Sequence, residues 1–289
     1  MKKKILIIGG NSLIGSNLSV YFKLKNFNII VGVRSLGRLN IKNISQFYYS
    51  DLSLKKNWKK IENKILTFKP DFLINCVGIT KHKKNKQNIR IINTYFPYFL
   101  SRLTIPYNFK LFHLSTDCVF DGKIGNYSEE SITTAKDSYG KTKAEAEKKI
   151  IKNKNCIILR SSILGHELYD HKNLLDWFIK CSDKRIYGFK NAFFSGPTAL
   201  EYGKILVKFI NKKNTIEGLY NIGTNKISKL NLLILINKIY KLNKIIKINK
   251  KLNIDRSLNI GKFKRTFKYK PKSWVQLLKE QKIFYEKYF

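Results

Sequence analysis

The chain has 289 residues, enough to bury a large apolar core as one α/β unit or as two lobes. Its formal net charge of +38 is spread over almost every segment, without an aromatic-rich basic helix, zinc-ligand spacing or an RNA-binding signature. This argues against nucleic acid as a partner and favours a solvated surface that also steers anionic substrates. The apolar runs are too short to cross a membrane and the four Cys show no paired spacing, so a cytoplasmic protein without a metal site is expected.

The first predicted element is a strand at residues 4–8, followed by a glycine-rich turn and a helix that ends near residue 24. Free backbone N–H groups and the helix dipole both favour an anion at such a helix start, so the turn predicts a dinucleotide phosphate site. The residues assigned to this site are Gly9, Asn11, Ser12, Leu13, Ile14 and Gly15.

A second strand, residues 28–33, ends at Arg34. An acidic side chain at this point usually binds the ribose 2′-hydroxyl of NAD, whereas an arginine suits the 2′-phosphate of NADP. Arg34, helped by Arg38, therefore predicts NADPH as the cofactor, with NADH disfavoured.

Two further strands, residues 47–50 and 72–77, end in segments that are also expected to contact the cofactor. Asp51 and Leu52 follow the third strand and are assigned to the adenine. The fourth strand ends in Cys76, Val77 and Gly78, where a small residue allows the backbone to approach the cofactor. Helices are predicted at about residues 54–68 and 87–103, with Asn93 on the inner side of the second helix.

The fifth strand, residues 110–114, runs into Ser115-Thr116-Asp117, as a buried strand does on reaching the open edge of a sheet. A helix capped by Asp137 or Ser138 then begins, and Tyr139 and Lys143 share one of its faces. Tyr-x-x-x-Lys occurs three times in this Lys-rich chain and is a weak signal alone. Only this copy follows such a strand and opens a capped helix, so it predicts a site that handles protons.

A sixth strand at residues 155–160 completes the regular alternation, which indicates a doubly wound parallel sheet of the Rossmann type. Residues 1–160 are predicted to form the dinucleotide-binding domain, and residues 161–289 a smaller C-terminal substrate-binding lobe from which some elements return to the sheet. In this second part loops are expected at 161–170 and 191–198, helices at 174–181, 200–210 and 228–240, and a strand at 218–222.

The ordered set of motifs resembles the extended short-chain dehydrogenase/reductases, and within them the nucleotide-sugar reductases of the dTDP-4-dehydrorhamnose reductase group. The resemblance covers almost the whole chain. Its residues are the loop from Gly9 to Gly15, Asn75 to Gly78, Asn93, Ser115-Thr116-Asp117, Val119 to Gly122, Tyr127, Glu129, Tyr139 to Lys143, Glu147, Arg160-Ser161-Ser162 and Pro197-Thr198.

The resemblance implies NADP-dependent reduction of the 4-keto group of a nucleotide-activated deoxy sugar, for the synthesis of a surface polysaccharide. Thr116 and Tyr139 would stabilise the charge that grows on the substrate oxygen, and Tyr139 would deliver its proton. Lys143 would hold the nicotinamide ribose and lower the pKa of Tyr139, and Asn93 would support Lys143 through a water.

Departures from the family pattern leave alternatives open. Ser12 replaces the second glycine of the usual loop, which puts cofactor affinity in doubt, and Ile163 stands where rhamnose-precursor reductases carry a tryptophan. In the GDP-fucose synthase branch a cysteine and a histidine epimerise the sugar before reduction, and Cys118 and His166 occupy comparable places.

A packed, structural Cys118 is the favoured interpretation, and Asp117 and Arg256 are the remaining weak candidates for substrate contact. A 4-epimerase without reduction is a further alternative, although Arg34 speaks against the NAD that such enzymes usually keep. Another is a non-catalytic NADP-binding regulatory subunit like the methionine adenosyltransferase β subunit. The sequence leaves the sugar, the nucleotide and the oligomeric state open, a homodimer included.

Overall fold

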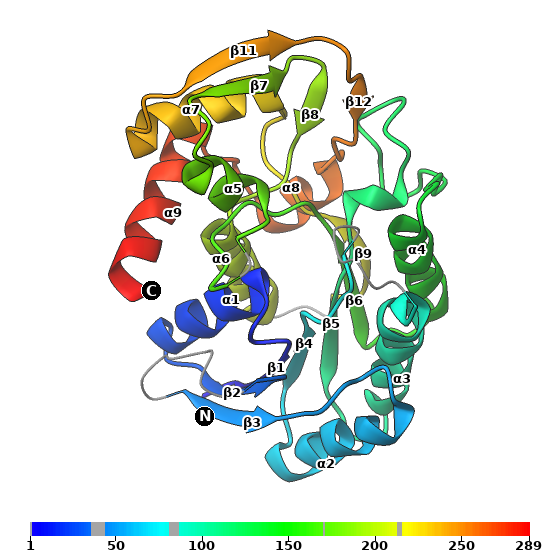
Figure 1. Ribbon diagram of the computed structural model, residues 1–289. Coiled ribbons are helices and arrows are strands. Elements are labelled where there is room, and N and C mark those ends of the chain that lie inside the picture. Colours follow the sequence, from blue (N-terminus) through cyan, green and yellow to red (C-terminus); the bar gives the residue numbers. More distant parts are fainter. Residues whose placement is uncertain (1, 36–43, 81–86, 170, 213–215) are drawn as a thin grey trace.

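A computed structural model of the chain describes residues 2–35, 44–80, 87–169, 171–212 and 216–289 (Figure 1). Its centre is one seven-stranded parallel sheet in the order β3-β2-β1-β4-β5-β6-β9. The strands of this sheet are β1 (Lys4–Ile8), β2 (Asn28–Val33), β3 (Ser45–Tyr48), β4 (Phe72–Asn75), β5 (Lys110–Leu114), β6 (Cys156–Arg160) and β9 (Gly218–Asn221).

The central strands are mostly apolar, as expected where helices cover both faces of a sheet. Ile5 to Ile8 of β1, for example, are fully buried. The predicted doubly wound parallel sheet is therefore confirmed. Three of its strands, β1, β2 and β5, have the bounds that the sequence predicts, and the others differ by one to a few residues at their ends.

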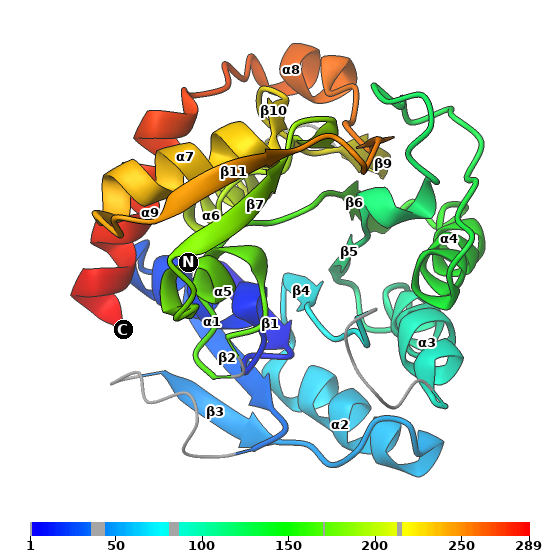
Figure 2. The same ribbon diagram turned by 45° about the horizontal axis from the view of Figure 1, so that its top comes forward.

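Two apolar cores lie on opposite sides of the sheet, one packed against α1 and α6 and the other against α2, α3 and α4 (Figures 1 and 2). The elements of these layers are α1 (Leu13–Leu24), α6 (Ala199–Ile210), α8 (Gly261–Phe267), the 3-10 turn η1 (Lys55–Asn57), α2 (Trp58–Phe68), the π-helical turn η2 (Ile91–Tyr95), α3 (Phe96–Leu103), the 3-10 turn η3 (Asp117–Val119) and α4 (Ser138–Ile150).

A third core holds together the part of the chain that lies above the sheet in Figure 1. Two small sheets, β11-β7 and β10-β8-β12, pack there with three helices. Their elements are α5 (Leu174–Lys180), β7 (Arg185–Phe189), β8 (Ala192–Phe194), β10 (Ile227–Ser228), α7 (Lys229–Tyr240), β11 (Ile245–Asn249), β12 (Ile254–Asp255) and α9 (Trp274–Tyr288).

The second half of the chain contributes to both regions. The predicted strand near residue 218 is β9, which pairs with β6 at the edge of the large sheet, and α6 packs against α1. The expected loop at residues 191–198 is wrong in part, because residues 192–194 form β8 between β10 and β12. The division of the chain at residue 160 stays a prediction.

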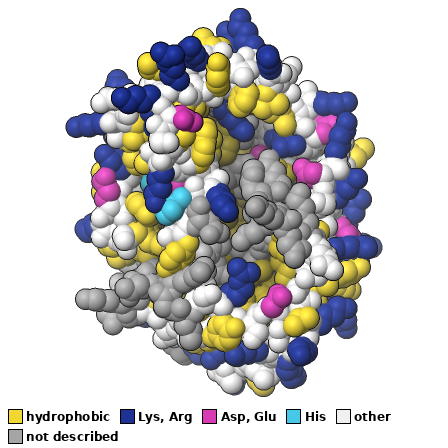
Figure 3. Space-filling view, viewed as in Figure 1, with side chains coloured by type: hydrophobic (Ala, Val, Ile, Leu, Met, Phe, Trp, Pro, Cys, Tyr) yellow, Lys and Arg dark blue, Asp and Glu magenta, His cyan; other side chains and the backbone are white. Residues whose placement is uncertain are grey.

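Outside the grey atoms, the visible surface carries Lys and Arg side chains at many separate places, with Asp and Glu scattered singly among them (Figure 3). The positive charge on the described part of this face is thus not gathered over one element. Among the described residues, none of the helices has the length and apolar composition that a membrane crossing requires.

Candidate active site

The predicted site residues come together where the parallel strands end, at the carboxyl edge of the large sheet. The strand order reverses between β1 and β4, because the chain moves outward from β1 to β2 and β3 and then returns to β4 on the other side. Connections on the two sides of such a switch point leave a crevice in which α/β proteins bind their ligands.

The glycine-rich turn begins this crevice, and two of its glycines are required by close packing. Gly9 has φ +96°, and a Cβ there would lie 2.9 Å from the backbone carbon of Cys76. A Cβ at Gly15 would lie 2.1 Å from the Gly9 carbonyl oxygen. The turn after β1, the loop after β4 and the first turn of α1 are therefore in direct contact.

Ser12 fits the position where the family usually has glycine. Its backbone is extended, with φ −79° and ψ 161°, which any residue adopts. Its hydroxyl accepts a hydrogen bond from the Gly15 N–H at 3.1 Å and caps α1. The N–H groups of Leu13 and Ile14 belong to the first turn of α1, where a helix offers them no acceptor, so this end can still bind an anion.

Arg34 lies exposed at the end of β2, where the turn holds its backbone in place. The Asn11 side chain accepts from the Arg34 N–H at 3.0 Å. Asp51 lies near enough for the Arg34 charge to lower its pKa, although hydrogen bonds from Ser53 lower that pKa more. The predicted helper Arg38 lies outside the described residues, and Leu52 is buried with its carbonyl bonded to Trp58.

Asn93 was predicted to support Lys143 through a water. In the structure its side chain bonds the loop after β4 instead. It lies in the π-helical turn η2, and its side chain bonds both the N–H of Ile79 at 2.8 Å and its carbonyl at 3.0 Å. Its Nδ2 also approaches the Thr142 hydroxyl at 3.4 Å. π-helical turns are frequent at functional sites, and this one fixes the loop that carries Cys76, Val77 and Gly78 against α4.

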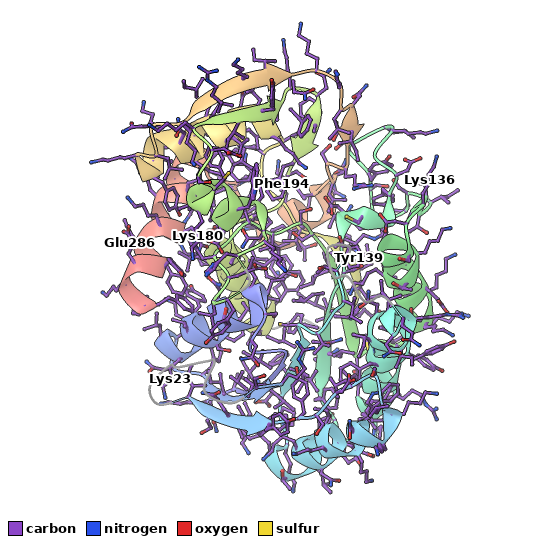
Figure 4. All side chains as sticks on the ribbon, in the orientation of Figure 1. Lys23, Lys136, Tyr139, Lys180, Phe194 and Glu286 are labelled. Atoms are coloured by element: carbon purple, nitrogen blue, oxygen red, sulfur yellow. The ribbon has the colours of Figure 1, made fainter. Side chains whose placement is uncertain are left out.

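Gly140 brings Tyr139 to the end of β5. A Cβ at Gly140 would lie 2.1 Å from the carbonyl oxygen of Cys118, so the first turn of α4 packs on η3 without any space between them. The Asp137 side chain caps this helix through the Gly140 N–H at 2.8 Å. Thr116 in turn caps η3, accepting from the Cys118 N–H at 3.1 Å. Tyr139 lies between α4 and the strands of the sheet, whereas Lys136 lies at the outer edge (Figure 4).

The surroundings of Tyr139 in the protein alone raise its pKa. Burial raises the pKa of Tyr139 above its ordinary value, and the nearby Cys118 and Asp117 raise it further, against a smaller opposing effect of the Thr116 hydroxyl. The Lys143 ammonium, one helical turn further along α4, donates to the Leu114 carbonyl at 2.5 Å. The predicted lowering of the tyrosine pKa relies on bound oxidised nicotinamide as well as on Lys143, and it stays a prediction.

Arg256 comes from the C-terminal region and reaches the turn η3. Its Nε donates to the Phe120 carbonyl at 2.8 Å, and its Nη1 lies 3.8 Å from the Cys118 sulfur. Asp117 bonds the Ser162 hydroxyl at the end of β6. Arg256 thus lies beside Cys118, and Asp117 joins the end of β6, while the role of these residues in substrate contact stays a prediction.

His166 is not part of this group. Its Nδ1 is 2.5 Å from an Asp176 oxygen, its Nε2 is 3.0 Å from the Tyr240 hydroxyl, and its ring stacks on Tyr285 at 3.9 Å between centroids. Asn17 of α1 bonds its carbonyl. With both ring nitrogens engaged and only 5% of its surface exposed, His166 has a structural role here.

Two buried features were not predicted as parts of the site. Glu147 and Arg160 form an ion pair at 2.7 Å beneath it, with each side chain 5% exposed. His113 of β5 lies 3.3 Å from the Lys143 ammonium. A histidine inside the apolar run of residues 110–114 was the available signal. Among the described residues, no group of three or more His, Cys, Asp or Glu side chains could hold a metal ion.

The chain matches the model of the RmlD substrate binding domain family over residues 2–187, nearly two thirds of its length. It belongs to this family. Within the curated proteins, a dTDP-4-dehydrorhamnose reductase of Aggregatibacter actinomycetemcomitans is 32% identical over 138 residues, 45% of this chain and 47% of the relative. The methionine adenosyltransferase 2 subunit beta of Xenopus tropicalis is 25% identical over 166 residues, 56% of this chain and 47% of the relative. These matches span about half the length of each relative.

Several solved structures share the fold of this RmlD family member, and their matches cover nearly the whole chain. A dTDP-4-dehydrorhamnose reductase of Bacillus anthracis in complex with NADP has a TM-score of 0.81 and 16% identity, and the match covers 98% of this chain and 99% of that one. The enzyme WbmG of Bordetella bronchiseptica in complex with NAD and UDP has a TM-score of 0.83 and 16% identity, covering 100% and 96%. Both confirm the fold.

Proposed function

We propose that the protein is an NADPH-dependent reductase of the 4-keto group of a nucleotide-activated deoxy sugar. The observation that carries this proposal is the packing of Gly140 on the Cys118 carbonyl, which sets Tyr139 beside Thr116 at the end of β5. The similarity to a dTDP-4-dehydrorhamnose reductase supports the same reaction class. A role in surface polysaccharide synthesis follows from that substrate class.

Reduction puts a hydride on carbon and a proton on oxygen, so negative charge grows on the substrate oxygen in the transition state. The hydroxyls of Thr116 and Tyr139 stabilise that charge, and Tyr139 delivers the proton. Because the pKa of Tyr139 is raised, the phenol begins the reaction protonated, as an acid in this direction requires. NADPH, when bound, supplies the hydride.

Residues around the switch point fit such a cofactor. The first turn of α1, with Leu13 and Ile14, offers N–H groups to the pyrophosphate, and Gly9 keeps the backbone close to the loop after β4. The exposed Arg34 guanidinium suits a 2′-phosphate. Lys143, one helical turn from Tyr139, would hold the nicotinamide ribose.

The nucleotide sugar would enter from the side of Arg256, whose guanidinium lies beside the turn η3. The position of His166 disfavours the epimerising alternative, because its ring nitrogens are already bonded to Asp176 and Tyr240. Cys118 then has no histidine partner for a two-base epimerisation, and inversion at C3 or C5 is not expected.

A second candidate function is that of a regulatory subunit without turnover. The similarity to the methionine adenosyltransferase 2 subunit beta favours it, and an intact catalytic set does not exclude it. The two candidates differ in one measurable property, the oxidation of NADPH by a nucleotide sugar.

The test is NADPH oxidation with a panel of dTDP-, UDP- and GDP-4-keto-6-deoxy sugars, with each product identified by NMR. Turnover of one sugar is expected, with a new stereocentre formed at C4 and no inversion at C3 or C5. Tyr139→Phe should lower kcat by at least ~10²-fold, the usual size of a general-acid effect, with NADPH binding retained. Tyr98→Phe, on the exposed side of α3, is the matched control and should leave kcat unchanged. NADPH binding without any oxidation would favour the regulatory subunit.

A further inference from the structure

His113 is a fully buried titratable residue in the middle of β5, whose other members are mostly apolar. Its Nε2 lies 3.3 Å from the Lys143 Nζ, and its Nδ1 has no hydrogen-bond partner within the described chain. An unpaired buried polar atom lowers stability, so a histidine here is poorly explained by packing.

A second unpaired polar atom lies next to it. Asn75 of β4 is the register partner of His113, and its Nδ2 also finds no partner among the described residues. The Asn75 Oδ1 accepts from the Val77 N–H at 3.1 Å. The two side chains form a buried polar layer between the loop after β4 and Lys143, at the place where the site is built.

Lys143 is 4% exposed, and only a few described groups stabilise its charged ammonium. Its ammonium donates to the Leu114 carbonyl at 2.5 Å and faces His113 from α4. Glu147, one turn further along α4, attracts it, although Arg160 of β6 pairs with the same carboxylate. Tyr139, one turn earlier, is protonated and contributes no negative charge.

We propose that His113 is a positioning residue for Lys143: its neutral imidazole accepts a hydrogen bond from the ammonium through Nε2, which fixes the ammonium at the site and keeps it protonated. The imidazole is neutral because burial and the Lys143 charge both hold the pKa of His113 well below its ordinary value. Nδ1 then carries the proton. The effect on turnover rests on the proposed function, whereas the effect on the charge of Lys143 does not.

This arrangement has a consequence for the pH dependence. Burial lowers the pKa of Lys143 to about 8, so the ammonium is partly lost just above neutral pH. Removing an acceptor disfavours the charged form and lowers this pKa further. The alkaline limb of the pH profile of kcat/KM should therefore move to lower pH when the acceptor is removed.

The test compares His113→Phe, which keeps a ring but has no acceptor, with His113→Gln, which restores an acceptor through its amide oxygen. The pKa of Lys143 is measured by NMR of protein labelled with ¹³Cε-lysine, with the Lys143 signal assigned from Lys143→Arg. His113→Phe should lower this pKa by about one unit, the size of an ordinary charge-assisted hydrogen bond. His113→Gln should return most of the shift, and the kcat/KM profiles should follow.

His113→Leu provides a second variant without an acceptor in case the larger ring disturbs the sheet, and melting temperatures identify any variant that fails to fold. An unchanged Lys143 pKa in both apolar variants would overturn the proposal, as would a shift of the same size in His113→Gln. Because the NMR titration needs no substrate, a shifted pKa without turnover on any sugar would leave this proposal standing and count against the reductase.

Discussion

At the carboxyl edge of the sheet, individual side chains have separate roles in the site. Ser12 caps α1 and leaves the first N–H groups of that helix for an anion, while Asn11 holds the backbone of Arg34. Arg34 is exposed and its guanidinium is not part of the core. It is therefore a side chain whose replacement should change cofactor choice without changing the fold.

Arg34→Asp should shift preference from NADPH towards NADH. The substitution removes the charge that favours the 2′-phosphate and provides a carboxylate suited to a 2′-hydroxyl, so we expect the ratio of kcat/KM for the two cofactors to fall by at least ~10-fold. The ratio is measured under one set of buffer conditions. Arg102→Asp, an exposed arginine of α3, is the control for net charge. If both variants change the ratio equally, Arg34 does not bind the 2′-phosphate.

Two elements, η3 and α4, have to pack without a gap for the site to exist. Gly140 allows this contact, since a Cβ there would lie 2.1 Å from backbone that cannot rotate away. Gly78 is different, because a Cβ there would meet only the Asn93 Oδ1, at 3.6 Å, which is an ordinary contact. A substitution at Gly140 therefore tests the packing of the protein, whereas one at Gly78 tests the approach of the cofactor.

Gly140→Ala should therefore displace Tyr139 from Thr116 and lower kcat by at least ~10-fold, because misplacement by about 1 Å costs up to ~10²-fold. It should also lower the melting temperature. Gly78→Ala should keep the melting temperature and, if the cofactor approaches this loop, raise the KM for NADPH. Melting curves and steady-state kinetics of both variants distinguish the two effects. If the Gly140→Ala variant were as active and as stable as the original protein, the close contact between α4 and η3 would not be needed for the site.

The ion pair between Glu147 and Arg160 joins α4 to β6 underneath the site. Glu147→Gln leaves the Arg160 charge buried without its counter-charge, so the free energy of unfolding should fall by about 3–5 kcal/mol. Glu145→Gln is the matched control on the same helix, since its partner Arg90 is largely exposed and the change should be at most ~1 kcal/mol. Denaturant titrations at neutral pH give both values, and equal losses would refute a special role for the buried pair.

The elements that the sequence predicted well are those whose signal is local. The apolar run of β1, the glycine turn and the cap at Asp137, predicted there or at Ser138, lie within a few residues of the structure they determine. The short strands β7, β8 and β11 were missed because their partners are distant. Residues 245–249 pair with residues 185–189, and nothing within either segment indicates the other.

The same difference between local and distant contacts explains which residues of the candidate site could be predicted. Thr116, Tyr139 and Lys143 lie within one strand-to-helix stretch, so a local motif was enough to predict them as a set. His166 could be assigned only by its position beyond the sixth strand, and long-range contacts with Tyr240 and Tyr285 decide its environment instead. His113 was overlooked because its partner, Lys143, is 30 residues away and on another element.

For the molecule as a whole, the net charge of +38 acts as a field, because basic side chains lie at many separate places on the described part of the visible face (Figure 3). A nucleotide sugar carries a diphosphate and would be attracted to this field before any specific contact forms. Ionic strength screens such an attraction, since the Debye length falls from ~30 Å at 0.01 M to ~8 Å at 0.15 M. Chemistry inside the crevice, at groups such as the half-buried Tyr139 and the buried Lys143, is screened much less.

The predicted outcome is a fall of kcat/KM for the nucleotide sugar by roughly tenfold between 0.01 M and 0.15 M ionic strength, with kcat almost constant. Steady-state kinetics in buffers that differ only in NaCl provide the measurement, and the same series with sucrose in place of salt controls for viscosity. A parallel fall of kcat would place the salt effect on the bound complex and not on the encounter. A kcat/KM independent of salt would mean that the positive surface is only solvated and does not attract the substrate.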